Sequence, residues 1–102
     1  MTTMTDREIE RRNRIKWAVA AYAYQIADDP VMTDEQFDRL ARKIRPQVTT
    51  GNILCDVYFR LHFNPDTAMM ITRHPEIGGI AHIYRVMGDL IRDYNIEGWR
   101  VR

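Results

Sequence analysis

The sequence has one cysteine, no long apolar run and no excess of either charge. Cys55 cannot form a disulfide within the chain, so the fold depends on its core alone. The longest mostly apolar run, residues 17–27, is too short to cross a bilayer, and residues 1–14 lack the apolar run of a signal peptide. Fifteen basic and fourteen acidic residues leave a net charge of +1, which provides no global attraction to nucleic acid or membranes. These absences predict a cytoplasmic protein.

What is present is typical of one small globular domain: 102 residues, of which 45% are hydrophobic and 28% charged. Apolar residues recur at helical spacing along most of the chain, and no strand pattern stands out. We therefore expect an all-α fold, a single domain of about five helices over residues 1–102. Residues 6–45 are expected to form an antiparallel helical hairpin and residues 50–94 the further helices. Residues 95–102 show no periodicity and predict a flexible tail.

Two helices joined by a short turn account for the first half. Asp6 is placed to cap a helix that extends to about residue 27 and ends ahead of Pro30, because proline disfavours helical geometry in the residue before it. Thr33 and Gln36 match a capping box that begins a second helix. The first helix begins with a polar half, which we expect to extend into solvent. An apolar stripe follows it: Ile15, Val19, Tyr22 and Ile26.

The second half contains signals for three further helices. Residues 49–52 offer caps for a helix within which Cys55 is expected to be at least half-buried. Asp66 is placed to cap a short fourth helix, and Pro75 fits the first position of a fifth. The expected core positions of the third helix are Ile53, Leu54, Val57, Tyr58 and Leu61. Those of the fifth are Ile77, Ile80, Ala81, Tyr84, Met87 and Ile91.

The most informative segment is residues 21–40. Its spacing matches a known pattern at Tyr22, Tyr24, Asp28, Pro30, Asp34, Asp38 and Leu40. The segment thereby resembles the N-terminal Ia domain of NAD-dependent DNA ligases, which carries this pattern on two helices joined by a short turn. The resemblance covers about the first 45 residues. The overall layout is similar to that of short ligase-related proteins found in phage and prophage genomes.

The resemblance implies a cofactor-binding site, because in this family the Ia domain holds the nicotinamide mononucleotide half of NAD+. It assigns ring stacking and hydrogen bonding to Tyr24, and polar contacts to Asp34 and Asp38. Gln25 and Phe37 belong to the same site but replace a histidine and a tyrosine of the family, so we expect weak binding of nicotinamide mononucleotide or NAD. Independently of the family, residues 28–38 contain five carboxylates and no basic residue, which suits a cationic ring.

No catalytic or metal site is expected. Ligation requires a nucleotidyltransferase lysine followed closely by Asp-Gly, and neither Lys16 nor Lys43 has that context. We therefore expect this chain to be a non-catalytic relative of the ligase Ia domain and not an enzyme. The three histidines and Cys55 match no zinc-binding spacing.

Purely structural roles explain several of these residues equally well. Tyr22 lies on the apolar stripe of the first helix and is expected in the core, and Tyr24 could pack there too. Asp34 could simply complement the helix dipole. Asp38 stands four residues before Arg42, the spacing of an ion pair on a helix surface.

A second function remains open. Arg7, Arg11 and Arg14 recur at i, i+4 and i+7, so they form an arginine stripe along the first helix. This stripe is either a solvated face or a surface that contacts nucleic-acid phosphates or an acidic partner protein. The alternative to a nucleotide-binding protein is therefore a small interaction protein that uses this stripe and has no nucleotide site.

Overall fold

The structure, a computed structural model, describes residues 5–94. The expected tail at residues 95–102 and the side chain of Ile91 lie outside the described residues. The all-α expectation is confirmed, and residues 5–94 contain no strand. None of the helices in this range is long and apolar enough to span a membrane. The elements are α1 (Asp6–Gln25), α2 (Asp34–Lys43), α3 (Ile53–His62), the 3-10 helix η1 (Met69–Arg73) and α4 (Ile77–Tyr94).

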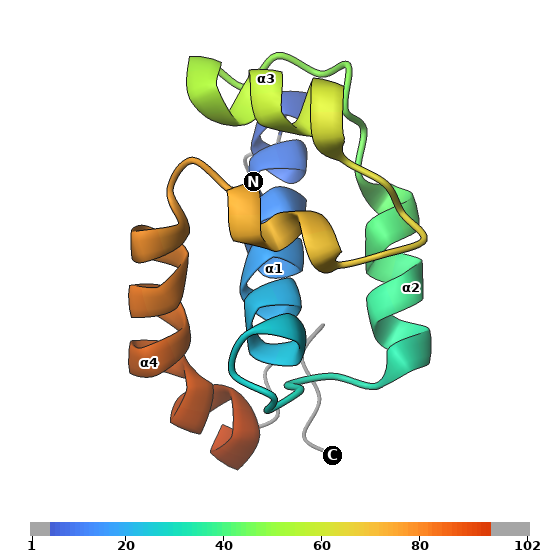
Figure 1. Cartoon of the computed structure of the whole chain (residues 1–102). Coiled ribbons are helices and arrows are strands. Elements are labelled where there is room, and N and C mark those ends of the chain that lie inside the picture. The colour runs from blue at the N-terminus through green and yellow to red at the C-terminus, as the bar shows by residue number, and fades with distance from the viewer. Residues whose placement is uncertain (1–4, 95–102) are drawn as a thin grey trace.

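Helix α1 is the centre of the fold (Figure 1). It contacts α2 on one side, α4 on the other, and η1. Helix α2 returns alongside α1 after a short connection, so the two form the expected antiparallel hairpin. Helix α3 lies across one end of α1 (Figure 1).

Side-chain caps define three of the helix starts. The Thr5 side chain accepts a hydrogen bond from the backbone N–H of Glu8 at 3.2 Å, so Thr5 rather than Asp6 caps α1. Thr33 and Gln36 form the expected capping box at the start of α2. Asn52 caps α3. Helix α1 ends slightly earlier than expected, because the chain turns through the left-handed region at residue 28, where φ is +51°.

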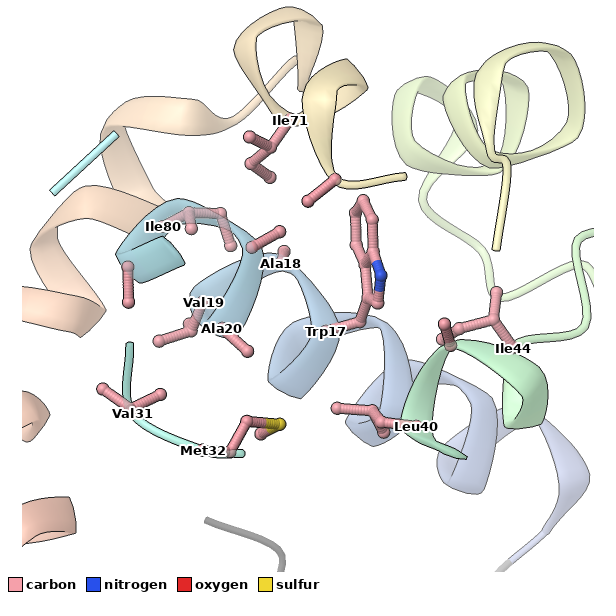
Figure 2. Close-up of a cluster of buried hydrophobic side chains, with 14 of the residues drawn as sticks. Trp17, Ala18, Val19, Ala20, Val31, Met32, Leu40, Ile44, Ile71 and Ile80 are labelled. Atoms are coloured by element: carbon pink, nitrogen blue, oxygen red, sulfur yellow. The ribbon is translucent and has the colours of Figure 1, made fainter. Parts of the chain in front are cut away.

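The core forms where the second half of α1 is enclosed by the other elements (Figure 2). Trp17 is fully buried, with its ring stacked on Phe37 at 6.2 Å and edge-on to Phe63 at 5.1 Å between centroids. Such aromatic pairs add about 0.5–1.5 kcal/mol each beyond the area they bury. Small side chains let the neighbouring elements approach closely along the rest of α1: Ala18, Ala20, Ala21 and Ala23. In the apolar stripe Val19 is buried and Tyr22 half-buried, but Ile15 and Ile26 are exposed.

Helix α3 packs with the opposite face to the one expected. Tyr58 is buried as expected, together with Asp56 and Phe59. Four expected core residues instead have exposed side chains, at 76%, 64%, 43% and 70%: Ile53, Leu54, Val57 and Leu61. Cys55 is half-buried, as expected. The apolar period of α3 was thus identified correctly and its inward face was not.

The last two elements depart from expectation at their starts. The expected fourth helix is η1, which begins three residues after Asp66 and has no side-chain cap. The Asp66 backbone N–H instead donates to the side chain of Asn64 at 2.8 Å, which holds residues 64–67 in a turn. Helix α4 begins two residues after Pro75. Its stripe is buried at Ile80 and Ala81, half-buried at Ile77 and Tyr84, and exposed at Met87.

Candidate functional site

A surface cavity of about 300 Å³ lies between the α1–α2 hairpin and the loop that precedes η1. Residues at the end of α1, on α2 and in that loop line it. All five residues that the ligase resemblance assigned to a cofactor site are among them: Tyr24, Gln25, Asp34, Phe37 and Asp38. The fold therefore brings these side chains together at one cavity.

The aromatic wall of this cavity is part of a stack of rings. Tyr24 lies almost parallel to Phe37, with an interplanar angle of 9° and 6.3 Å between centroids. Phe37 in turn stacks on the buried ring of Trp17. Tyr24 is 47% exposed, so part of its ring remains accessible. Of its two expected roles, core or cavity, the geometry supports the cavity.

Among the described residues, the charged side chains that line the cavity are all acidic. Asp34 and Asp38 come from successive turns of α2, and Asp66 comes from the facing loop. Asp38 also accepts a hydrogen bond from Arg42 at 3.2 Å, the expected i, i+4 pair, and both side chains are more than half exposed. An exposed pair of this kind is worth at most about 0.5 kcal/mol, so it does not prevent Asp38 from contacting a ligand.

The other acidic residues of the 28–38 segment point elsewhere. Asp29 accepts a hydrogen bond from the Tyr84 hydroxyl of α4, and Glu35 pairs with Arg39 at 3.4 Å. Neither lines the cavity. Asp28 does not line it either, so the expectation of five carboxylates beside one ring is wrong. Asp28 and Asp29 belong to the turn after α1, and Glu35 is on the side of α2 that carries Arg39. Tyr22 packs against Tyr84 at 5.5 Å and belongs to the core, as expected.

The facing wall could not be assigned from the sequence. It is the turn Pro65–Asp66–Thr67–Ala68, which begins more than 20 residues after the end of α2 along the chain. The sequence marks Asn64-Pro65-Asp66 as a turn. No local signal indicates that this turn lies opposite Tyr24 and Asp38.

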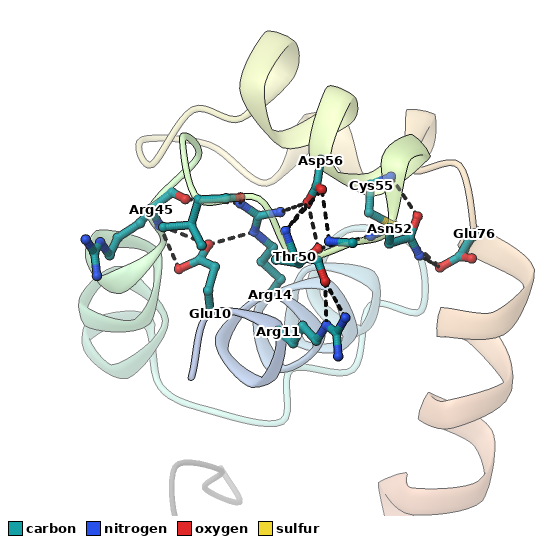
Figure 3. Close-up of polar contacts among 11 residues, drawn as sticks. Glu10, Arg11, Arg14, Arg45, Thr50, Asn52, Cys55, Asp56 and Glu76 are labelled. Atoms are coloured by element: carbon teal, nitrogen blue, oxygen red, sulfur yellow. Dashed lines mark hydrogen bonds and ion pairs between the residues drawn. The ribbon is translucent and has the colours of Figure 1, made fainter. Parts of the chain in front are cut away.

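The expected exposed arginine stripe on α1 is wrong, because Arg14 is buried (Figure 3). Its guanidinium donates to Glu10 at 2.6 Å, to Asp56 at 2.8 Å, and to the backbone carbonyls of residues 45 and 48. It also lies 4.8 Å from the centroid of the Phe59 ring. Arg11 donates to the carbonyl oxygen of Thr50. Arg7 has no such contact among the described residues, and Arg7 and Arg11 are both exposed, so the surface carries two of the three arginines of the expected stripe.

Glu10, Arg14 and Asp56 form a buried ionic cluster that joins α1, α3 and the connection between α2 and α3 (Figure 3). Asp56 accepts from the Thr50 hydroxyl at 2.6 Å, from the Thr50 backbone N–H at 3.1 Å and from Arg14. Burial raises the pKa of Asp56, but these hydrogen bonds outweigh it, so the pKa lies below the usual 3.8. The polar half of α1, expected to extend into solvent, is therefore partly interior.

A smaller cavity of about 170 Å³ adjoins this cluster and contains Cys55, His74 and Glu76. Burial and the neighbouring Glu76 carboxylate raise the pKa of the Cys55 thiol to about 12. Burial lowers the pKa of His74, whose Nδ1 accepts from the backbone N–H of Glu76 at 3.0 Å. The Cys55 thiol donates to the Glu76 carboxylate at 3.4 Å, and within residues 5–94 no hydrogen bond joins it to His74.

No group of three or more His, Cys, Asp or Glu side chains within the described part of the chain is arranged to hold a metal ion. Comparisons of the chain with protein-family models, with curated proteins and with solved structures found no match.

Proposed function

We propose that this chain is a non-catalytic nicotinamide-nucleotide-binding protein, a relative of the ligase Ia domain. One observation carries the proposal. The five residues that the ligase resemblance assigns to a cofactor site line a single cavity in the fold: Tyr24, Gln25, Asp34, Phe37 and Asp38. Capping and turn formation explain why some of these residue types occur, but they do not require all five to surround one hollow.

The chemistry of the cavity suits the nicotinamide end of the nucleotide. A pyridinium ring is flat and positively charged, so it is attracted to an aromatic face and to nearby carboxylates. The stacked Tyr24 and Phe37 rings provide the face, and Asp34, Asp38 and Asp66 the negative charge. A volume of about 300 Å³ is at the small end for ligand sites, which suits the nicotinamide ring and its ribose rather than a whole dinucleotide.

The same charges disfavour the phosphate of the ligand. No cationic side chain of residues 5–94 lines the cavity, and Arg42 beside it is paired with Asp38. Nicotinamide mononucleotide should therefore bind weakly, with a Kd of about 1 mM. We expect its affinity to be lower than that of a pyridinium compound without phosphate.

The experiment is an NMR titration with pairs of matched ligands. 1-Methylnicotinamide and nicotinamide share one ring and differ in its positive charge, while nicotinamide riboside and nicotinamide mononucleotide differ in the phosphate. The proposal expects saturable shifts confined to residues 24–25, 34–38 and 65–68, with the charged ring bound more tightly than the neutral one. Absence of saturable shifts with every ligand at about 10 mM would refute it.

Variants sharpen this test. Tyr24→Ala and Asp38→Asn should each weaken binding, whereas Glu35→Gln removes an exposed carboxylate of α2 outside the cavity and should leave binding unchanged. Phe37→Tyr restores the hydroxyl that the ligase family carries and should tighten binding about 2- to 12-fold, the value of one hydrogen bond. Equal weakening by Asp38→Asn and Glu35→Gln would indicate non-specific attraction of cations.

The alternative, an interaction protein that uses the arginine stripe, has less support. Arg14 is buried in an ionic cluster and Arg11 already donates to Thr50, so the stripe has lost one arginine and Arg7 is the one with no contact among the described residues. Charge reversal at Arg7 distinguishes the two functions, because it should abolish binding to a partner and leave the ligand titration unchanged.

A further inference from the structure

The hairpin carries a second pocket whose charged lining is entirely basic. It has a volume of about 210 Å³ and lies between α1 and α2. Lys16 of α1 and Arg39 and Lys43 of α2 line it, together with the side-chain amides of Asn13 and Gln36. It shares no residue with the acidic cavity. At 100° per residue, the two sets of α2 residues lie on opposite sides of that helix.

The donors in this pocket are largely unused. Neither lysine makes an ion pair or side-chain hydrogen bond within residues 5–94, and Arg39 has only its exposed pair with Glu35. The side-chain oxygen of Gln36 accepts the capping-box bond from residue 33, so its NH₂ group remains a free donor. Leu40 is buried at one side of the pocket.

Lysine is rare in this chain, so the presence of both lysines at one pocket supports a role for that pocket. The sequence contains thirteen arginines and two lysines, and both lysines line this one pocket. Lysine amines are flexible point charges with three donors each, a common means of holding phosphate. Like charges that share one pocket repel each other, so a bound anion would also stabilise the fold.

We propose that this pocket binds a phosphate group, held by Lys16 and Lys43 with support from Arg39. The phosphate is either free, as in a small phosphorylated compound, or part of a nucleic-acid strand, and both share the chemistry that the pocket recognises. This site is independent of the proposed nicotinamide site, because no residue contributes to both.

The test compares sodium phosphate and pyrophosphate with sodium chloride at matched ionic strength, by thermal unfolding and NMR. The proposal expects phosphate to raise the melting temperature above the value in chloride, with shifts at residues 13–16 and 36–43. Lys16→Gln and Lys43→Gln should each weaken the apparent affinity about tenfold. Arg12→Gln removes an exposed charge of α1 outside the pocket and is the matched control.

Each outcome decides the proposal. Equal stabilisation by phosphate and chloride would overturn it, as would an equal loss in Arg12→Gln and the lysine variants. A single-stranded oligonucleotide identifies the source. Tighter binding of the oligonucleotide through the same two lysines would assign the phosphate to nucleic acid, and binding of pyrophosphate alone would assign it to a small compound. Because Lys43 is exposed, its variant reports on binding even if Lys16→Gln perturbs the fold.

A different observation supports a second proposal, which concerns α3. Ile53, Val57 and Leu61 are spaced by four residues on its outward face with Leu54 beside them, and all four are exposed. Together they expose on the order of 500 Å² of apolar surface, as large as the main patch of a typical monomer. The exposed Arg60 borders one edge of this patch, and the four apolar side chains lie together beside it. Two copies of the patch can cover each other about a two-fold axis.

We infer that α3 pairs with α3 of a second copy of this chain. An antiparallel pair centred on Val57 places Ile53 of each copy against Leu61 of the other. Burying both faces gives on the order of 1,000 Å², the lower limit for a specific interface, so a weak dimer is expected.

Sedimentation from about 5 µM to about 500 µM tests this pairing. Leu61→Arg should abolish a dimer seen for the unmodified protein. Val86→Arg, at a 57% exposed position of α4, should leave it intact. A monomer throughout, an assembly larger than a dimer, or a dimer insensitive to Leu61→Arg would each overturn the proposal.

Discussion

Removing the Asp56 carboxylate should cost more stability than any other single acidic-to-alanine change in the described part of α2 or α3. Asp56 is only 4% exposed, and it accepts hydrogen bonds from Thr50, from the backbone N–H of Gly51 and from Arg14. Asp56→Ala leaves the Arg14 guanidinium buried with one carboxylate, Glu10, and leaves the Thr50 N–H without its acceptor.

The expected cost is about 3–5 kcal/mol, the usual penalty for breaking a buried ion pair by removing one partner. A chain of this length has a free energy of unfolding of about 5–15 kcal/mol, so the loss is a large fraction of the total. The matched control is Asp38→Ala. Its pair with Arg42 is exposed to solvent, and removing it should cost about 0.5 kcal/mol or less.

Urea unfolding followed by circular dichroism at neutral pH measures both values. A cost for Asp56→Ala within about 1 kcal/mol of that for Asp38→Ala would refute the reasoning, because the buried cluster would then contribute little. The pH dependence provides a second check. The pKa of Asp56 in the folded protein is below the unfolded value of 3.8, so its contribution is complete above about pH 5 and is lost as the pH falls. The difference between wild type and Asp56→Ala should therefore narrow below pH 3.8.

Three further outcomes follow from single residues. Burial raises the pKa of the Cys55 thiol to about 12, so its thiolate fraction at pH 8 is about 1,000-fold smaller in the native protein than in urea. Alkylation should be slower in the native protein to a similar degree, and equal rates would contradict the burial of this thiol. Gly51→Ala should destabilise the folded protein by about 1–2 kcal/mol, because φ is +96° and the added Cβ would lie 3.1 Å from the Arg11 guanidinium. Gly79→Ala in α4 is the contrast: its Cβ meets nothing within 4 Å, so this change should stabilise the folded protein by about 0.5–1 kcal/mol. Burial lowers the pKa of His74, so its NMR titration midpoint should lie below 6.5 in the native protein and rise in urea. The neutral, buried imidazole contributes to the free energy of unfolding, and this contribution should be lost as the pH falls through the midpoint of the native protein.

Sequence periodicity predicted the helices well and their inward faces less well. The capping box at Thr33 depends on residues three positions apart, so local sequence determines it. The orientation of α3, by contrast, involves a contact between residues far apart in the sequence. Asp56 of α3 pairs with Arg14 of α1, which lies 42 residues earlier. Asp56 faces inward, where it pairs with the buried Arg14, and Tyr58 and Phe59 are buried on the same side, so the remaining apolar residues of α3 face outward. No pattern within α3 contains that information.

The candidate site also has one part that could be predicted from the sequence and one part that could not. The resemblance to the ligase hairpin assigned Tyr24, Phe37 and Asp38 to one site. They line one cavity because two helices joined by a short turn have a nearly fixed geometry. The wall at residues 65–68 depends on how the chain returns from α3, and periodicity does not encode that path. The basic pocket was missed for another reason. Its cations come from two helices at positions that, taken singly, are ordinary solvated surface.

The two pockets together constrain how a nucleotide can bind. Helix α2 presents Asp34 and Asp38 to the acidic cavity and Arg39 and Lys43 to the basic pocket. A helix with its side chains is about 10 Å wide, and the ribose that joins a pyridinium ring to its phosphate is too short to reach around it. A ring bound beside Tyr24 therefore leaves its own phosphate among carboxylates, while the lysines on the far side remain free for a different phosphate. The hairpin thus favours separate ligands of opposite charge over a single nucleotide held at both ends.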